Sequence, residues 1–187
     1  MALAIYSKTC AKNVSGNYHK VFFGAVTDIT AITVSASPYE ITAITNGTKF
    51  KKFDAEIDSV QFKYEGAGAA NYFTTQTLVM KFAKKTTALV AAIDELVKQV
   101  TCGVVAIHVD GNGLAWLDGY DGKATDPTAR PFNKIKVTYD SGTKPSDEEG
   151  NIVVVELTRE SEWPNIPFDS TLSSSILSGG ATAFITY

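Results

Sequence analysis

Apolar and polar residues alternate in two neighbouring segments, 60–65 and 77–82, and this period of two constrains the fold more than any other feature of the chain. Side chains of a β-strand point alternately to opposite faces, so the pattern predicts strands with one buried face. A loop of small residues at 66–70 separates the two segments. The apolar positions are Val60, Phe62, Tyr64, Leu78, Met80 and Phe82.

A further strand signal surrounds the dipeptide Asn46-Gly47. The segments 40–45 and 48–53 on either side of it are rich in β-branched and aromatic residues. Asn-Gly readily supplies the positive φ angles that a type I′ turn requires. The sequence therefore predicts a tight hairpin that spans residues 40–53.

One amphipathic α-helix is predicted over about residues 86–100. Thr86 or Thr87 can cap its start, and Lys98 near its end suits the negative end of the helix dipole. The apolar residues recur at the spacing of a single helix face, which predicts packing against a sheet. These residues are Leu89, Ile93, Leu96, Val97 and Val100.

The nearly continuous apolar run at 103–107 indicates a central strand that is covered on both faces. A turn at 110–113 and an apolar segment at 114–117 then predict a second hairpin. Further strands are expected at 135–139, 152–157 and 181–187, whereas 118–131, 141–150 and 161–180 have the composition of loops or irregular chain.

These elements predict a mainly β protein, a sandwich or barrel of about eight to ten strands with one packed helix. No repeat or linker divides the chain, so a single β-rich domain over 1–187 is expected, with an extended N-terminal segment and loops. The net charge of −3 argues against a strong general attraction to nucleic acid or to anionic membranes.

The charge is unevenly distributed between the two halves of the chain. Residues 1–99 carry 11 Lys and 8 acidic residues, and residues 100–187 carry 6 basic and 12 acidic residues. Two interpretations stay open: chance segregation on one solvated surface, or a polarised subunit whose basic end meets the acidic end of a neighbour.

The N-terminus lacks the pattern of a signal peptide, and no segment has the roughly 20 apolar residues that span a membrane. The two cysteines, Cys10 and Cys102, lie far apart in the sequence without a motif, which is typical of idle thiols in a reducing compartment. We therefore expect a soluble protein made in a cytoplasm.

No pattern of catalytic residues is present, and the protein is not expected to be an enzyme. His19 and His108 have no nucleophile motif beside them, and His108 is best interpreted as structural. The Asp- and Asn-rich stretch 110–126 lacks the regular spacing of a calcium loop. The Gly-rich loop 66–70 is not followed by a helix that could bind phosphate. No metal, cofactor or small-molecule substrate is expected.

The segments 40–53, 72–100 and 104–119, followed by 141–150, resemble in pattern and order a group of small phage and prophage virion proteins. The layout with one packed helix is also similar to the tail-tube fold of long-tailed phages. In that family, rings of six subunits join their sheets into a continuous inner barrel and stack head to tail. The resemblance implies a virion protein that is assembled in the host cytoplasm.

The same resemblance implies that the protein binds itself and other virion proteins, and that DNA passes through its tube without being read. The hairpin at Asn46 and Gly47 and the loop 66–70 are then candidate assembly contacts. A basic group and an acidic loop of neighbouring copies are candidate partners: Lys49, Lys51 and Lys52 with Asp147, Glu148 and Glu149. The mixed basic and aromatic residues at 49–53 also suit nucleic-acid binding, although Lys51 and Lys52 must point to opposite faces of a strand.

Three alternatives remain open. Another virion role, such as a capsid, decoration, tail-terminator or connector protein, would use the same architecture. A carbohydrate-binding module could present Trp116, Trp163 and some of the eight tyrosines as sugar platforms. An enzyme would need a constellation of His and Asp side chains that the sequence does not reveal.

Overall fold

A computed structural model describes residues 19–36, 39–56, 59–66, 74–122, 127–140, 152–161, 163, 165–179 and 184–186. The described chain is mainly β, with two α-helices, as the strand periodicity predicts. No described helix has the length and apolarity needed to cross a membrane.

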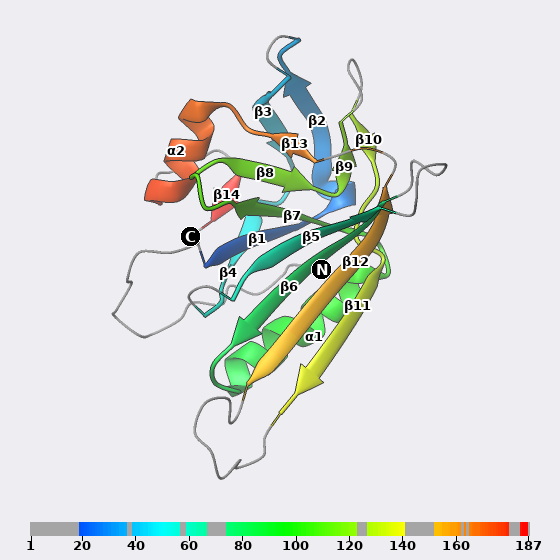
Figure 1. Cartoon of the computed structure of the whole chain (residues 1–187), viewed down its shortest axis with the longest axis vertical. Coiled ribbons are helices and arrows are strands. Elements are labelled where there is room, and N and C mark those ends of the chain that lie inside the picture. The colour runs from blue at the N-terminus through cyan, green and yellow to red at the C-terminus, as the bar shows by residue number, and fades with distance from the viewer. Residues whose placement is uncertain are drawn as a thin grey trace.

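A six-stranded sheet lies at the centre of the fold (Figure 1). Its strands, in spatial order, are β13 (Ile166–Pro167), β8 (Ala115–Asp118), β7 (Val104–Val109), β1 (Lys20–Ala25), β4 (Phe50–Asp54) and β14 (Ile185–Thr186). Every residue of β7 is buried, which confirms the central strand predicted from the apolar run at 103–107. The predicted hairpin of β7 and β8 is also confirmed.

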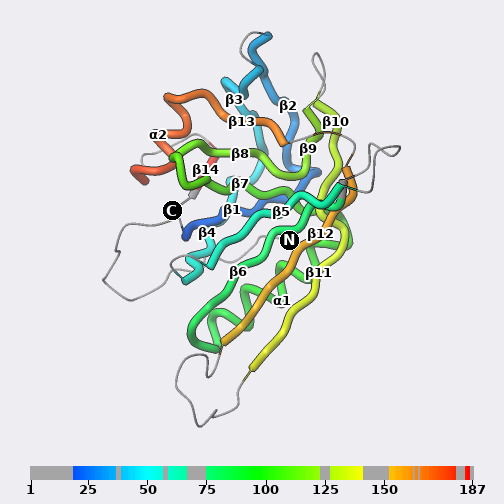
Figure 2. Tube along the Cα trace, viewed as in Figure 1, coloured from blue at the N-terminus to red at the C-terminus, as the bar shows by residue number. Residues whose placement is uncertain are grey.

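A four-stranded antiparallel sheet covers one face of the central sheet. It consists of β11 (Lys134–Tyr139), β12 (Val153–Ser161), β6 (Thr74–Phe82) and β5 (Gln61–Gly66), in that spatial order. The helix α1 (Thr87–Val100) lies behind this sheet (Figures 1 and 2). The helix begins as predicted, because the Thr86 side chain accepts a hydrogen bond of 3.1 Å from the Leu89 amide.

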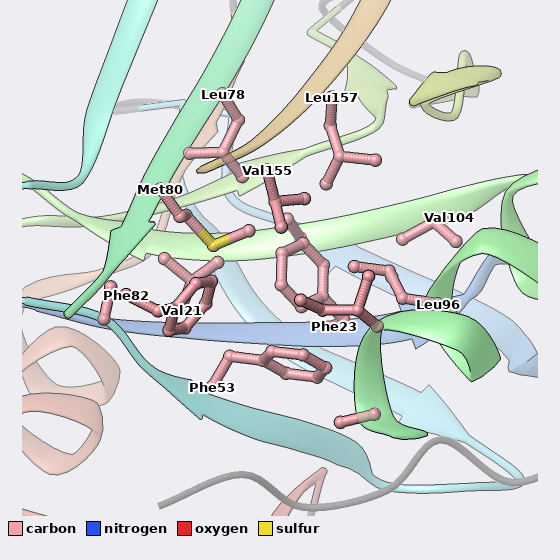
Figure 3. Packing of buried hydrophobic residues seen from close by; sticks show 14 of the residues in the cluster. Val21, Phe23, Phe53, Leu78, Met80, Phe82, Leu96, Val104, Val155 and Leu157 are labelled. Atoms are coloured by element: carbon pink, nitrogen blue, oxygen red, sulfur yellow. The ribbon is translucent and has the colours of Figure 1, made fainter. Parts of the chain in front are cut away.

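Side chains from both sheets and α1 form the larger hydrophobic core. Phe23 of β1 packs edge-on against Phe53 of β4, with ring centroids 5.1 Å apart. Figure 3 shows Met80 and Val155 in the same cluster as these two rings. The predicted inward positions Leu78, Met80 and Phe82 are buried. Val97 does not join this core, and 37% of it is exposed although its spacing matched the buried helix face.

A second core lies on the opposite face of the central sheet. It is covered by the hairpin of β2 (Ile29–Val34) and β3 (Ile41–Asn46) and by the helix α2 (Ser170–Ser178). The short helix η1 (Val26–Asp28) joins β1 to β2, and β9 (Tyr120–Asp121) pairs with β10 (Thr128–Ala129). The predicted loop 118–131 therefore contains two short strands.

The predicted hairpin over residues 40–53 is wrong. β3 pairs with β2, β4 pairs with β1, and the two strands belong to different sheets. The Asn46 side chain donates to the Thr48 carbonyl at 2.9 Å and to the Phe184 carbonyl at 3.2 Å, while the Gly47 amide donates to the Asp28 carbonyl. These bonds turn the chain from the outer hairpin into the central sheet, where Phe50 and Phe53 are buried.

The prediction that residues 161–180 are irregular is also wrong. α2 is capped by Asp169, whose side chain accepts from the Leu172 amide at 2.7 Å, and ends at Gly179 with a φ of 73°. Burial of Ile176 against the second core stabilises this helix despite its weak serine-rich propensity. The predicted C-terminal strand is confirmed for β14; Phe184 lies just before it, and residues 181–183 and 187 lie outside the described ranges.

Candidate functional site

The four-stranded sheet has two open margins, which we call the β5 edge and the β11 edge. In the described part of the chain, β5 pairs only with β6 and β11 pairs only with β12. Figure 1 shows the two strands on opposite sides of the sheet. An unpaired edge presents backbone N–H and C=O groups that can pair with another chain.

Each edge also carries an exposed tyrosine. Tyr64 on β5 is 48% exposed and Tyr139 on β11 is 42% exposed. Tyr64 lies opposite the buried Gln76, and Tyr139 lies opposite the buried Val153, so both point to the core side of the sheet. The sequence predicted a buried face for β5, but its position at the edge leaves that face partly uncovered.

The outer face of the same sheet is polar and nearly balanced in charge. Lys63, Lys81, Lys134 and Lys136 lie on it, together with Glu65, Glu156 and Glu160. Threonines occupy much of the remainder, and Lys134 forms an exposed ion pair with Glu160 at 3.3 Å. Such a face has no large apolar patch that would need a covering layer.

A cavity of about 380 Å³ lies between β5 and the β7–β8 hairpin. Phe62 and Tyr64 line it from β5, and His108, Asp110 and Trp116 line it from the hairpin. The Asp110 carboxylate accepts from the Trp116 indole at 3.1 Å and from two backbone amides of the turn. The cavity is therefore mainly aromatic, with one fixed carboxylate.

The wall of the cavity is supported by the imidazole of His108, which stacks on the ring of Phe62. The rings of Phe62 and His108 are 4.9 Å apart and 2° from parallel. His108 Nδ1 lies 2.6 Å from a carboxylate oxygen of Asp118, which is fully buried. Burial raises the pKa of the Asp118 carboxyl, and the charges of His108 and Arg159 oppose that rise. The hydrogen bond fixes the orientation of the imidazole beneath Phe62.

Arg159 extends this polar network across the junction of the sheets. Its side chain is 1% exposed and donates to Gln76 Oε1 at 2.6 Å, to the Arg130 carbonyl at 2.6 Å and to Asn165 Oδ1 at 2.7 Å. Asn165 in turn donates to Asp118. A buried cation is tolerated only when its hydrogen bonds are satisfied, so this network fixes how the two sheets join.

The hydroxyl of Tyr64 lies close to the same network. Burial raises its pKa to about 12, the Asp118 charge adds to the rise, and the Asn165 backbone and the Arg159 charge oppose it. The phenol is therefore neutral at any physiological pH. Tyr64 offers an aromatic face and a polar hydroxyl at the same edge.

The basic residues that the sequence singled out lie together around the start of β4. Lys49 is exposed, whereas Lys51 and Lys52 are half-buried in the central sheet. Lys52 forms an ion pair with Asp54 of its own subunit at 3.4 Å. This lysine is therefore already paired, which weakens the predicted contact between the three lysines and the acidic loop of a neighbour. Asp147, Glu148 and Glu149 lie outside the described residues, so their pairing with a neighbour's lysines stays a prediction.

The aspartates of the stretch 110–126 do not gather at one point. Asp110 caps its own turn, Asp118 contacts His108, and Asp121 accepts from Ser161 and Arg159. Asp126 lies outside the described ranges. Among the described residues there is no group of three or more potential metal-ligating side chains. Cys102 is a free, exposed thiol, and Cys10 is not described.

Comparison with known proteins shows no matching family model, no similar curated protein and no similar solved structure. The two edges were not among the residues that the sequence singled out. The sequence shows apolar residues at every second position of both strands, at Phe62 and Tyr64 and at Ile135, Val137 and Tyr139. It does not show the order of the strands in the sheet. Only that order identifies these two strands as the margins of one sheet.

Proposed function

We propose that the protein is a structural subunit that joins copies of itself through the β5 and β11 edges and builds a tail-tube-like conduit of a phage virion. The observation that carries the proposal is that no described strand pairs with the outer side of β5 or β11, and that each of these strands carries an exposed tyrosine. Large aromatic residues at an unpaired edge are costly in a monomer and are typical of an interface core.

The direction of the strands suits a ring. Each strand of the sheet is antiparallel to its neighbour, so β5 and β11 run in opposite directions. When copies are related by rotation, the β5 edge of one copy meets the β11 edge of the next in antiparallel pairing. An interface between two different patches closes into a ring when the rotation permits, and the resemblance to tail tubes favours six copies.

In such a ring the polar outer face of the four-stranded sheet would line the lumen. Four lysines and three glutamates on this face nearly cancel. A balanced, hydroxyl-rich surface binds the phosphate backbone only weakly, which suits DNA that passes without being read.

The connection between β3 and β4 is the proposed contact between stacked rings. Asn46, Gly47 and Lys49 lie there, and the fixed bonds of the Asn46 side chain hold this turn in one conformation. A rigid turn loses little conformational entropy on docking. Other virion proteins would meet the free ends of the stack.

Negative-stain electron microscopy of the purified protein, across a series of concentrations and salt conditions, tests the proposal. Rings of one diameter, alone or stacked into hollow tubes, are the expected result. Closed particles of fixed size would assign a capsid, decoration or terminator role instead. A monomer under all conditions would contradict self-assembly.

A second candidate function rests on the aromatic cavity. Trp116 and Tyr64 beside the fixed carboxylate of Asp110 form a combination that suits a sugar ring with its hydroxyl groups. A glycan array distinguishes this carbohydrate-binding role. Binding that is lost in Trp116→Ala but kept in Trp163→Ala would favour it over the conduit.

A further inference from the structure

The cavity beside β5 is open next to an unpaired strand edge, and this position restricts what can fill it. Phe62 and Tyr64 face into it, while Lys63 and Glu65 of the same strand face the outer side of the sheet. A strand that pairs with β5 would bring its own inward side chains to the cavity. The β11 edge of a second copy is such a strand.

Only certain registers between β5 and the next copy's β11 keep apolar side chains on the inward face, because a shift of one residue reverses every side chain. Both strands have six residues. Two registers keep the faces matched and use nearly the full length of both strands. One pairs 61–65 with 138–134, and the other pairs 62–66 with 139–135.

Charge separates the two registers. The first sets Lys63 directly opposite Lys136 of the neighbour, where like charges are destabilising, although it also sets Glu65 opposite Lys134. The second sets Glu65 opposite Lys136 and Lys63 opposite Thr138. The second register therefore keeps one ion pair between copies and removes the repulsion.

We infer that β5 binds the β11 edge of a second copy in this second register, so that the neighbour's Tyr139 enters the cavity over Phe62. In the same register Val137 of the neighbour covers Tyr64. The two exposed tyrosines thus become buried in one interface, each against an apolar partner. The inference rests on the proposed function and adds the residues that pair.

The surroundings of Tyr139 match the charge of the cavity. The Lys85 ammonium lies 4.9 Å from the centre of the Tyr139 ring and would accompany it to the interface. The cavity contributes the Asp110 carboxylate, whose hydrogen bonds to the turn and to Trp116 are already made. An aromatic ring with a cation beside it suits a site of aromatic rings and one anion.

Disulfide trapping between copies tests the register. In a background with Cys10 and Cys102 changed to serine, Lys63→Cys combined with Thr138→Cys is expected to form cross-linked ladders under mild oxidation. Lys63→Cys combined with Lys136→Cys reports the rejected register and is the matched control. Within one copy the two edges are separated by three strand spacings of about 4.8 Å, too far for a disulfide.

Electron microscopy of the same samples separates failure of the register from failure of the proposed function. Assembled particles with ladders from the 63–138 pair and few from the 63–136 pair support the inference. Particles whose ladders come from the 63–136 pair, or from neither pair, overturn the register and leave the conduit standing. The absence of particles in the cysteine-free parent overturns both.

A charge exchange provides a second readout that does not depend on oxidation. Glu65→Lys alone and Lys136→Glu alone are each expected to lower the fraction of assembled protein at least tenfold. The double variant is expected to recover most of it, because the pair is restored with its signs reversed. Circular dichroism of each variant verifies the fold, and a double variant no better than the single ones would overturn the pairing.

Discussion

Tyr64 and Tyr139 lie on the two outer strands of one antiparallel sheet and point to the same side of it, although three strand spacings separate them within the subunit. Neither ring has enough covering chain in the described structure to be buried. Each tyrosine alone would be an ordinary exposed aromatic residue. Together they mark the two margins of the sheet that the proposed interface would join.

Removal of the Tyr139 ring is expected to prevent assembly without unfolding the subunit. In Tyr139→Ala the interface loses its largest apolar group, so the concentration at which half of the protein assembles should rise at least tenfold. Val97→Ala is the matched control, because Val97 is also partly exposed, at 37%, but belongs to α1 and to neither edge strand. Sedimentation velocity measures both variants. Equal assembly of the two would contradict an interface at the β11 edge.

Loss of the Arg159 guanidinium is expected to cost about 3–5 kcal/mol of the free energy of unfolding. Arg159→Met leaves the buried Asp121 and Gln76 without the donor that now contacts them. Lys134→Ala removes only an exposed ion pair with Glu160 and should cost less than about 1 kcal/mol. Urea denaturation of the monomer compares the two. Similar losses would mean that the buried network contributes little.

Two glycines should differ in how much stability they lose when replaced by alanine. Gly119 has a φ of +111°, and an added Cβ would lie 2.6 Å from Val105 Cγ1, so Gly119→Ala should cost on the order of 3 kcal/mol. Gly47 lies outside the left-handed region, and its Cβ would meet nothing closer than 3.9 Å. Gly47→Ala should therefore change stability by less than about 1 kcal/mol. A large loss of stability in Gly47→Ala would instead indicate a positive φ angle at Gly47, as in the type I′ turn that the sequence predicted.

The ionisation of Tyr64 predicts a specific pH dependence. Its pKa in the folded subunit is raised from 10.0 to about 12, so the folded state holds the phenol proton more tightly than the unfolded chain. This contribution to stability is complete below pH 10 and is lost as the pH rises through about 12. Denaturation midpoints of the wild type should fall more steeply over that interval than those of Tyr64→Phe. Parallel curves would show that the hydroxyl is not sheltered.

The sequence predicted those helices and strands whose apolar residues follow a clear local pattern. Examples are the fully buried β7, the apolar stripe and Thr86 cap of α1, and the alternating β6. α2 was missed because its serines have weak helix propensity, although Asp169 just before the helix and Gly179 just after it are capping signals.

Pairing between strands distant in the sequence could not be predicted in this way. The Asn46-Gly47 signal favoured a local hairpin, but burial of Phe50 and Phe53 in the central sheet and the bonds of Asn46 outweighed it. The candidate site has the same origin. Phe62, His108, Asp118 and Arg159 meet only because two sheets join there, and no spacing in the sequence encodes that meeting.

Hydrogen exchange of the backbone amides, compared between assembled and monomeric protein, tests the central claim most directly. Pairing of the edges predicts that amides of 61–66 and 134–139 exchange at least tenfold more slowly in the assembly, while the exposed face of α1 is unchanged. Assembled particles whose β5 and β11 amides exchange as fast as those of the monomer would contradict edge-to-edge joining.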